Sequence, residues 1–288
     1  MIERVAIIGT GLIGASIGLA LKGLEENPPI AVVGWDSSAT ELAKALEIGA
    51  IDEALDANDV YDPDVADVFV LATPVLPIMD WMERLAPGLV PFQLVTDVGS
   101  TKREIVEVAR RLYNGPRQGR FLAGHPMAGK ESGGAELAEP GLFHDAAWLF
   151  TPIDDQRTEI EREWITLVKR FGARVMELDA ERHDEVCAWV SHLPQMLSTA
   201  LSALLEETFA GDAEGMAAVQ AIGGRALRET TRLGSSPYSM WRDVAMTNAG
   251  PIATAMAALE QRLQHVRENL RTPELREEFR TANRFRGK

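Results

Sequence analysis

Residues 5–21 read VAIIGTGLIGASIGLAL, in which an apolar run is followed by Gly9, Gly11 and Gly14 and then by an apolar helical stretch. A strand, a G-x-G-x-x-G turn and a helix in this order are typical of a dinucleotide-binding unit. Gly9 permits the tight turn, Gly11 removes a side chain where a pyrophosphate meets the backbone, and Gly14 lets the helix pack against the strand. The phosphates would bind the free amides at the helix N-terminus, which include those of Leu12 and Ile13. A glycine-rich turn without a ligand is the structural alternative.

An acidic residue follows the next predicted strand. Asp36 lies 22 residues after Gly14, where a carboxylate accepts hydrogen bonds from the adenine ribose hydroxyls. A carboxylate there repels the additional phosphate of NADP, and no arginine follows directly, so the sequence predicts NAD as the cofactor. Asp36 could instead begin a turn with Ser37 and Ser38. Thr73, directly after a later predicted strand, is the remaining candidate for cofactor binding.

Short β-branched runs alternate with helical stretches through the first part of the chain. The predicted strands are residues 5–8, 31–35, 68–72, 94–97, 121–124, 147–150 and 174–178. Several are apolar throughout, as expected for strands covered on both faces, so we predict an α/β domain with a mainly parallel, Rossmann-type sheet. From residue 179 only helical periodicity remains, which predicts a second, all-helical domain. The predicted domains are therefore residues 1–178 and 179–288.

Two stretches of the helical domain, residues 197–205 and 252–263, are apolar around more of the helix than a small bundle needs. We interpret them as a domain core that continues into a subunit interface, so a homodimer is expected. A core alone is the alternative. The charged segment 271–288 is either a solvated helix or a frayed tail.

The charge of the chain excludes several classes of partner. It has 43 acidic and 29 basic residues and a formal net charge of −14. Such a surface repels nucleic acid and offers no polybasic face for membrane docking. No stretch approaches the roughly 18 apolar residues of a membrane span, so we expect a cytoplasmic protein. The single cysteine, Cys187, excludes an internal disulfide and a cysteine-based metal cluster.

Two polar residues follow strands of the predicted sheet, where an open parallel sheet binds its ligand. Ser100 ends the segment Asp-Val-Gly-Ser at 97–100, just before a helix, and its simplest role is that of a helix N-cap. His125 belongs to the glycine-rich segment Gly-His-Pro-Met-Ala-Gly at 124–129, which is followed by Lys130 and Glu131. Because His125 ends a strand in the sheet that would bind the dinucleotide, we expect a catalytic role for it and not a structural one.

Further candidates lie in the helical domain. His192 belongs to Ser-His-Leu-Pro at 191–194, where Pro194 interrupts a helix that begins near residue 180. A buried structural histidine is the alternative. Four arginines, one of which is Arg232, lie within residues 225–242 of an otherwise acidic chain. Most are expected to be solvated or paired with neighbouring acids, but a carboxylate substrate needs at least one.

Taken in order, these segments resemble the prephenate/arogenate (cyclohexadienyl) dehydrogenase family. The matching motifs are the glycine-rich start, the segments 97–100, 124–129 and 191–194, and Thr-Arg at 231–232 followed by Met-Trp-Arg-Asp at 240–243. The resemblance covers essentially the whole chain. It implies an enzyme of tyrosine biosynthesis with a modified nucleotide-binding domain and a helical domain that forms a homodimer. The implied reaction is NAD-dependent oxidative decarboxylation of prephenate or arogenate, which gives 4-hydroxyphenylpyruvate or tyrosine, carbon dioxide and NADH.

The resemblance also implies roles for individual residues. His125 matches the catalytic histidine that accepts the proton of the substrate hydroxyl, and Ser100 matches the residue that hydrogen-bonds the same hydroxyl. Arg232 and His192 match positions that hold a substrate carboxylate, for which the planar fork of an arginine is well suited. Glu131 matches a residue that guards the mouth of the pocket.

Gln195 leaves the substrate open. It follows the Ser-His-Leu-Pro motif and is a histidine in many prephenate-directed relatives. An amide can donate to a keto acid or accept from an amine, so prephenate, arogenate or both remain possible. No metal is expected, because aromatisation drives the decarboxylation and the nicotinamide takes the electrons.

Two other classes of protein compete with this interpretation. Another nucleotide-binding dehydrogenase with a helical second domain, such as a hydroxyacid dehydrogenase or an imine reductase, would carry a lysine or a different acid as its central group. It would also lack the Gly-His-Pro and Ser-His-Leu-Pro motifs. A redox-sensing, NAD-binding regulator is compatible with the fold, but it needs a nucleic-acid or partner surface, and the charge of −14 argues against the first.

Overall fold

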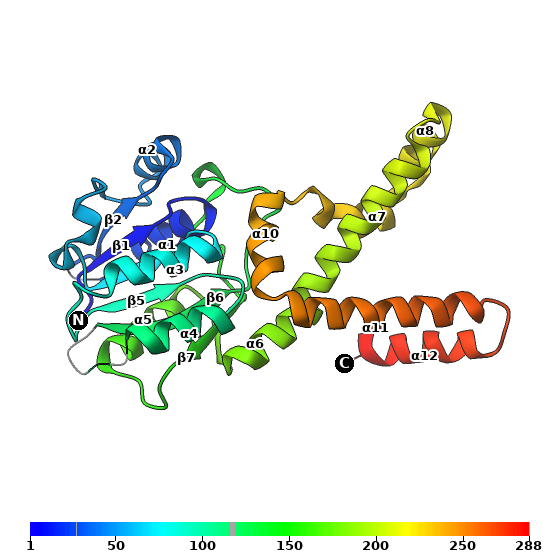
Figure 1. Cartoon of the computed structure of the whole chain (residues 1–288). Coiled ribbons are helices and arrows are strands. Elements are labelled where there is room, and N and C mark those ends of the chain that lie inside the picture. The colour runs from blue at the N-terminus through cyan, green and yellow to red at the C-terminus, as the bar shows by residue number, and fades with distance from the viewer. Residues whose placement is uncertain (27, 114, 116–118, 288) are drawn as a thin grey trace.

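The computed structural model describes residues 1–26, 28–113, 115 and 119–287 (Figure 1). The predicted domains also include residues 27, 114, 116–118 and 288, which lie outside the described residues. Eight strands of the described chain form one sheet in the order β3-β2-β1-β4-β5-β6-β7-β8. They are β1 (Arg4–Ile8), β2 (Ala31–Trp35), β3 (Glu53–Ala54), β4 (Val68–Leu71), β5 (Leu94–Asp97), β6 (Arg120–Pro126), β7 (Ala147–Pro152) and β8 (Arg174–Glu177). Neighbouring strands are parallel except β6 and β7, so the predicted α/β fold with a mainly parallel sheet is confirmed.

Helices cover both faces of this sheet, which explains why its strands read as continuous apolar runs. Ile7 and Trp164 belong to the buried cluster on one face, whereas Ile8 and Ile78 belong to the cluster on the other. Adjacent residues of β1 therefore point to opposite faces of the sheet, and both faces are shielded from solvent. The helices are α1 (Leu12–Lys22), α2 (Ala39–Glu47) and α5 (Glu159–Arg170) on the first face, and α3 (Val75–Leu85) and α4 (Arg103–Leu112) on the second.

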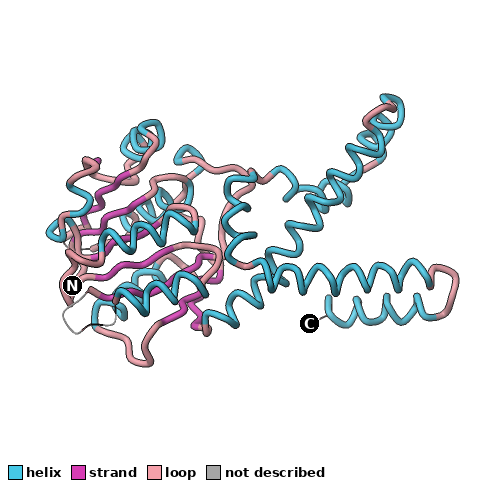
Figure 2. The backbone as a smooth tube through the Cα atoms, in the orientation of Figure 1, coloured by secondary structure: helices cyan, strands magenta, loops and turns pink. Residues whose placement is uncertain are grey.

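After β8 the chain is helical, as Figure 2 shows in cyan. The elements are α6 (Ala180–Cys187), the π-helical turn η4 (Ala188–His192), α7 (Leu193–Phe209), α8 (Ala213–Ile222), α9 (Gly224–Thr231), the 3-10 turn η5 (Arg232–Ser235), α10 (Tyr238–Thr247), α11 (Ala249–Glu268) and α12 (Glu274–Arg286). A wide π-helical turn just before Pro194 accommodates a residue that cannot donate a backbone hydrogen bond. The predicted interruption at Pro194 is therefore a local widening of a helix that continues through it.

The helical domain buries little of its own apolar surface. The buried residues of α7 are Gln195 and Ser198, and those of α11 are Ile252 and Ala255. In Figure 1, α7 with α8 and α11 with α12 extend away from the sheet as two arms. Large apolar side chains are exposed along these arms; they include Leu204, Ile222, Leu263, Phe279 and Phe285. The described chain thus leaves an uncovered apolar helical surface.

Two carboxylates of the helical domain hold it against the sheet domain. Asp184 on α6 accepts hydrogen bonds from the backbone amides of Lys102 and Arg103 at the start of α4, at 2.7 and 2.9 Å. Asp243 on α10 accepts one from the amide of Leu76 at the start of α3, at 3.2 Å. Both carboxylates are buried, and an anion at a helix N-terminus is stabilised by free amides and by the helix dipole.

Among the described residues, no helix has the length and apolar character needed to span a lipid bilayer. Cys187 is buried at the end of α6 with a free thiol. It packs as a small interior residue, which agrees with the absence of a partner cysteine in the sequence.

Candidate active site

A cavity of about 370 Å³ lies between the two domains at the carboxyl edge of the sheet. It is lined by the glycine turn after β1, by Thr73 after β4, by Ser100 after β5 and by His125 in β6. Met240 and Val244 of α10 contribute to the lining from the helical domain. Because ligands of open α/β sheets bind at the carboxyl ends of the strands, this cavity is the candidate active site.

The structure brings part of the predicted site together on this cavity. The predicted residues that line it are Gly11, Leu12, Ile13, Thr73, Ser100, His125 and Glu131. The predicted residues outside its lining are Gly9, Gly14, Asp36, His192, Gln195 and Arg232. A larger hollow of about 610 Å³ lies between α6 and α11, but its lining contains none of the predicted site residues.

The glycines of the turn have the geometry that the sequence predicts. Gly9 has a φ of 96°, a left-handed conformation that favours glycine. A Cβ on Gly14 would collide with the carbonyl oxygen of Gly9, so the close approach of α1 to the turn requires glycine there. Around Gly11, by contrast, the described chain places no atom within 4 Å of a Cβ position, its chain neighbours excluded. Packing does not explain Gly11, whereas a phosphate at the N-terminus of α1 does.

Asp36 follows β2 and accepts hydrogen bonds from two backbone amides. Its Oδ2 accepts from the amide of Thr10 in the glycine turn at 2.7 Å, and its Oδ1 accepts from the amide of Ser38 at 2.8 Å. The turn that the sequence allowed as an alternative is therefore present. A carboxylate oxygen has two acceptor positions, and Asp36 is only partly buried, so Oδ1 can still accept from a hydroxyl.

His125 is 7% exposed and lies at the cavity. Its Nδ1 lies 2.9 Å from Nε2 of His183 on α6, and Nδ1 of His183 lies 2.9 Å from Oδ1 of Asp184. Burial lowers the pKa of His125 well below its ordinary value, and electrostatic interactions with the His183 and Lys102 side chains lower it further. The ring is therefore neutral near neutral pH, which is the form that can accept a proton.

A fully buried ion pair between Lys102 and Asp97 lies at the end of β5. The carboxylate of Asp97 also accepts hydrogen bonds from the amides of Gly99 at 2.8 Å and Gly124 at 3.1 Å. Asp97 thus joins the ends of β5 and β6. These are the two segments that carry the predicted catalytic residues.

Ser100 is not the N-cap of α4. The helix begins at Arg103, and its first amides donate to Asp184 of the helical domain. The helix-capping alternative for Ser100 is therefore wrong. Its half-buried side chain lies at the lining of the cavity instead.

Arg232 in η5 forms an ion pair with Glu131, which lies in the loop after β6. The pair links the helical domain to the glycine-rich loop that lines the cavity. The side chains are 59% and 31% exposed, respectively, so the pair is open to solvent and contributes little stability. A substrate carboxylate can therefore compete with Glu131 for the guanidinium of Arg232.

His192 and Gln195 are buried in the helical domain. Nδ1 of His192 lies 3.1 Å from Nδ2 of Asn248, while its Nε2 is buried with no hydrogen-bond partner among the described residues. Burial lowers the pKa of His192 to about 4. The amide of Gln195 donates to the carbonyl of Leu233 at 2.7 Å and accepts from the hydroxyl of Ser236 at 3.3 Å. In this structure Gln195 is therefore engaged by the chain itself.

Sequence reasoning did not single out His183, Asp184 or Lys102. The available signal for the first two was a His-Asp pair directly after the domain boundary. The contact of His183 with His125 and that of Asp184 with the start of α4 arise from the packing of α6 against the sheet domain, which local sequence does not reveal. Lys102 lies two residues after the Asp-Val-Gly-Ser motif. A lysine is rarely buried unless it is paired, and the sequence alone does not show that Lys102 pairs with Asp97 of that motif.

Ligand atoms of His125, His183 and Cys187 lie within 4.8 Å of one another, which is a spacing compatible with a metal site. Hydrogen bonding accounts for the grouping, because the two imidazole nitrogens lie 2.9 Å apart. Two nitrogens on a tetrahedral zinc ion lie about 3.3 Å apart, given the usual bond lengths. Burial raises the pKa of the Cys187 thiol to about 12, which keeps it protonated and a poor metal ligand.

Comparison with known proteins identifies the family. A model for the nucleotide-binding domain of prephenate dehydrogenase matches residues 17–177, and a model for its dimerization domain matches residues 179–282. The chain belongs to the prephenate dehydrogenase family. It is similar to the prephenate dehydrogenase of Bacillus subtilis (strain 168), with 32% identity over 253 residues, which cover 88% of this chain and 66% of the relative. The chain thus spans about two thirds of the length of that curated relative.

Two solved structures of similar proteins share the fold. The arogenate dehydrogenase of Synechocystis is 28% identical, with a TM-score of 0.77 and 99% of both chains covered. The prephenate dehydrogenase of Aquifex aeolicus, in complex with hydroxyphenyl propionate and NAD⁺, is 26% identical, with a TM-score of 0.86 and coverage of 99% of this chain and 98% of that chain. The match to the family model begins at residue 17, so the assignment of the glycine turn depends on its own geometry.

Proposed function

We propose that this chain catalyses the NAD-dependent oxidative decarboxylation of prephenate, arogenate or both, a reaction of tyrosine biosynthesis. The observation that carries the proposal is the position of His125. Its neutral ring lies on the same cavity as the glycine turn and residues of the helical domain. Similar proteins named as prephenate and arogenate dehydrogenases support the substrate class.

His125 would act as the general base. A hydride leaves the ring carbon that bears the hydroxyl, and a carbonyl forms there as the hydroxyl proton departs. A neutral imidazole within hydrogen-bond reach accepts that proton. Loss of the carboxylate as carbon dioxide then returns an electron pair to the ring, which becomes aromatic. Ser100, on the same cavity, would hydrogen-bond the hydroxyl and hold it against His125.

The residues around the N-terminus of α1 fit NAD. Gly11 leaves open space that packing does not explain, and Leu12, Ile13 and Thr73 line the adjoining cavity. Asp36 would accept from the adenine ribose and disfavour a phosphate at that position. When bound, the nicotinamide accepts the hydride. The similar Aquifex aeolicus protein has been solved as a complex with NAD⁺, which supports this cofactor.

Two residues of the helical domain would hold the carboxylates of the substrate. Arg232 would exchange its solvent-open pair with Glu131 for a substrate carboxylate, leaving Glu131 at the mouth of the cavity. His192 carries a buried Nε2 that lacks a partner among the described residues, and such an atom gains from a polar ligand. The amide oxygen of Gln195 accepts from Ser236 and has a second lone pair, with which it would accept from the amine of arogenate.

We further propose that residues 1–178 bind the dinucleotide and that residues 179–288 bind substrate and form a homodimer. The exposed apolar side chains of α7, α8, α11 and α12 support a subunit interface on the two arms. The family model that matches residues 179–282 describes a dimerization domain. Sedimentation of the purified protein should give twice the chain mass of 31.5 kDa, and a monomer would count against the interface.

The proposed reaction is tested by incubating the purified protein with NAD and either prephenate or arogenate while following NADH absorbance. NADH should appear with at least one substrate, together with an equal amount of carbon dioxide and an aromatic product. Parallel assays with NADP provide the cofactor comparison. NADH formation with neither substrate would refute the proposal.

A further inference from the structure

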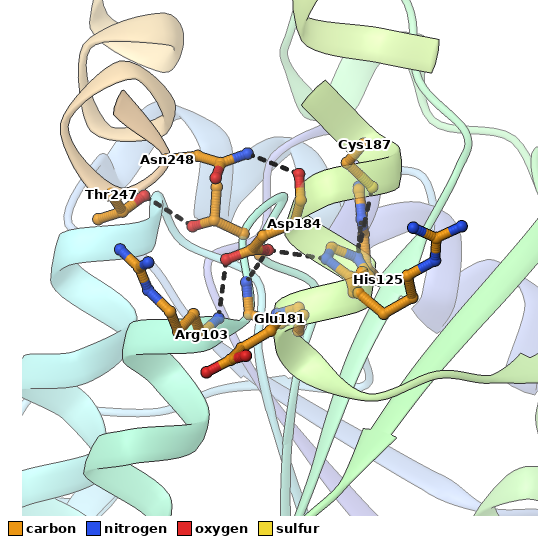
Figure 3. A network of polar contacts seen from close by, with 12 residues as sticks. Arg103, His125, Glu181, Asp184, Cys187, Thr247 and Asn248 are labelled. Carbon is orange, nitrogen blue, oxygen red and sulfur yellow. Dashed lines mark hydrogen bonds and ion pairs between the residues drawn. The ribbon is translucent and has the colours of Figure 1, made fainter. Parts of the chain in front are cut away.

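A chain of hydrogen bonds leads from His125 into the helical domain, and Figure 3 shows it from close by. Nδ1 of His125 lies 2.9 Å from Nε2 of His183, and Nδ1 of His183 lies 2.9 Å from Oδ1 of Asp184. His183 is fully buried and Asp184 is 2% exposed. The hydrogen bond between His183 and Asp184 is therefore shielded from solvent.

Asp184 is held in its anionic form. Burial alone would raise its pKa, but hydrogen bonds from His183 and from the amides of Arg103 and Lys102 lower the pKa below its ordinary value. The two amides donate from the N-terminus of α4, at 2.9 and 2.7 Å, where the helix dipole also favours an anion. An ionised carboxylate can only accept hydrogen bonds.

The fixed charge of Asp184 determines where the ring protons lie. Because Asp184 accepts, Nδ1 of His183 must carry the hydrogen, which leaves a lone pair on Nε2 of a neutral His183. That lone pair accepts from Nδ1 of His125, so Nδ1 of His125 must carry its hydrogen. The remaining nitrogen of neutral His125, Nε2, then has the lone pair that a general base needs.

We propose that His183 and Asp184 are positioning residues that hold His125 in the tautomer with its hydrogen on Nδ1 and stabilise the imidazolium formed when Nε2 accepts a proton. This inference rests on the proposed function of His125. The proton that Nε2 takes from the substrate hydroxyl leaves a positive ring whose Nδ1–H already faces a lone pair backed by a carboxylate. No further oxidant, reductant or ion is needed.

A purely structural role is the competing explanation, because Asp184 also caps α4 and thereby joins the domains. The thiol of Cys187, 3.6 Å from Nε2 of His183, is a further neighbour, but it is a weak donor and does not replace His125. The test must therefore read out proton positions and turnover separately from stability.

Histidine ¹⁵N NMR of the full-length protein reads the proton positions directly, and the sequence contains five histidines. In the wild type, His125 should be protonated on Nδ1 and not on Nε2, and His183 should have the same tautomer. A wild-type His125 with its hydrogen on Nε2 would overturn the proposal. This readout needs no turnover, so failure to oxidise either substrate would refute the proposed function while the tautomer still decides the hydrogen-bond chain.

Kinetics of a matched pair of variants give the second test. His183→Leu and His183→Gln both lose the contact with Asp184, but only glutamine offers an oxygen to Nδ1 of His125. The kcat of His183→Leu should fall by about a hundredfold or more, while its KM should change less than about threefold. The kcat of His183→Gln should be at least about tenfold higher than that of His183→Leu. Equal kcat values for the two variants, or a leucine variant near wild type, would overturn the proposal.

A further pair of variants separates the effect of the Asp184 charge on turnover from the effect of the domain contact on stability. Asp184→Asn removes the charge and should lower kcat by about tenfold to a thousandfold. Thr247→Val removes a buried hydrogen bond of 2.7 Å to Thr101, at the same domain contact but outside the chain of imidazoles. It should lower the thermal stability and leave kcat within about twofold. A loss of kcat in Thr247→Val as large as that in Asp184→Asn would overturn the proposal in favour of a structural role.

Discussion

Acidification should lower the free energy of unfolding through protonation of His192, and the size of the effect follows from the burial of this side chain. The ring is fully buried, and burial lowers its pKa from 6.5 to about 4. The unfolded chain therefore binds the proton at a higher pH than the folded chain does. The stabilisation is fully present above pH 6.5 and is lost as the pH falls toward 4, because over that interval only the unfolded state gains the proton. At about 1.4 kcal/mol for each pH unit, the loss in the free energy of unfolding is about 3 kcal/mol.

The measurement compares urea unfolding of the wild type and of His192→Asn at a series of pH values between 7 and 4, at one protein concentration, followed by tryptophan fluorescence. Asparagine does not titrate, and the carboxylates titrate in both proteins, so the difference between the two curves isolates His192. The two free energies of unfolding should converge by about 3 kcal/mol as the pH falls. His144→Asn, at a side chain that is 71% exposed, is the matched control and should follow the wild type. Curves for the wild type and His192→Asn that stay parallel would refute the reasoning.

Three further predictions concern cofactor, substrate and core. Asp36→Ala should narrow the ratio of kcat/KM between NAD and NADP, and a wild type that prefers NADP would contradict the role of Asp36. Arg232→Ala should raise the substrate KM by roughly tenfold to a hundredfold through loss of a charge-assisted hydrogen bond, whereas Arg271→Ala, on the segment before α12, should not. Lys102→Met leaves the buried carboxylate of Asp97 without its partner and should lower the free energy of unfolding by about 3 to 5 kcal/mol; a change below about 1 kcal/mol in thermal or urea unfolding would contradict this.

The central strands could be predicted from the sequence because they are buried on both faces and most of their residues are apolar. β3 was not predicted, since it consists of the exposed residues Glu53 and Ala54 and pairs with β2 alone. The predicted helical domain includes α10, but the sequence did not mark α10 as a separate helix, because its buried residues are Asp243, Val244 and Thr247. Two of those three side chains, Asp243 and Thr247, are polar, and both form hydrogen bonds with residues of the sheet domain.

Part of the candidate site could be predicted from the sequence and part could not. The glycine turn and His125 could be found because their chemistry lies within short segments that follow strands. The residues that act on His125 come from another domain: His183 lies 58 residues further along the chain and reaches it through α6. A helix capped by its own serine is the expected local arrangement, yet α4 is capped by Asp184 from across the domain boundary. Contacts of this kind depend on the packing of whole elements, which sequence periodicity does not encode.

The central claim is that His125 is the base, and the pH dependence of kcat/KM for the wild type and for His125→Asn tests it most directly. Because burial lowers the pKa of His125, wild-type activity should be full at neutral pH and should fall only as the pH drops below 6.5. His125→Asn should be slower by about a hundredfold to ten-thousandfold, should lack that fall, and should bind NAD as the wild type does. A variant with near-wild-type turnover, or one that keeps the same acidic limb, would contradict the account.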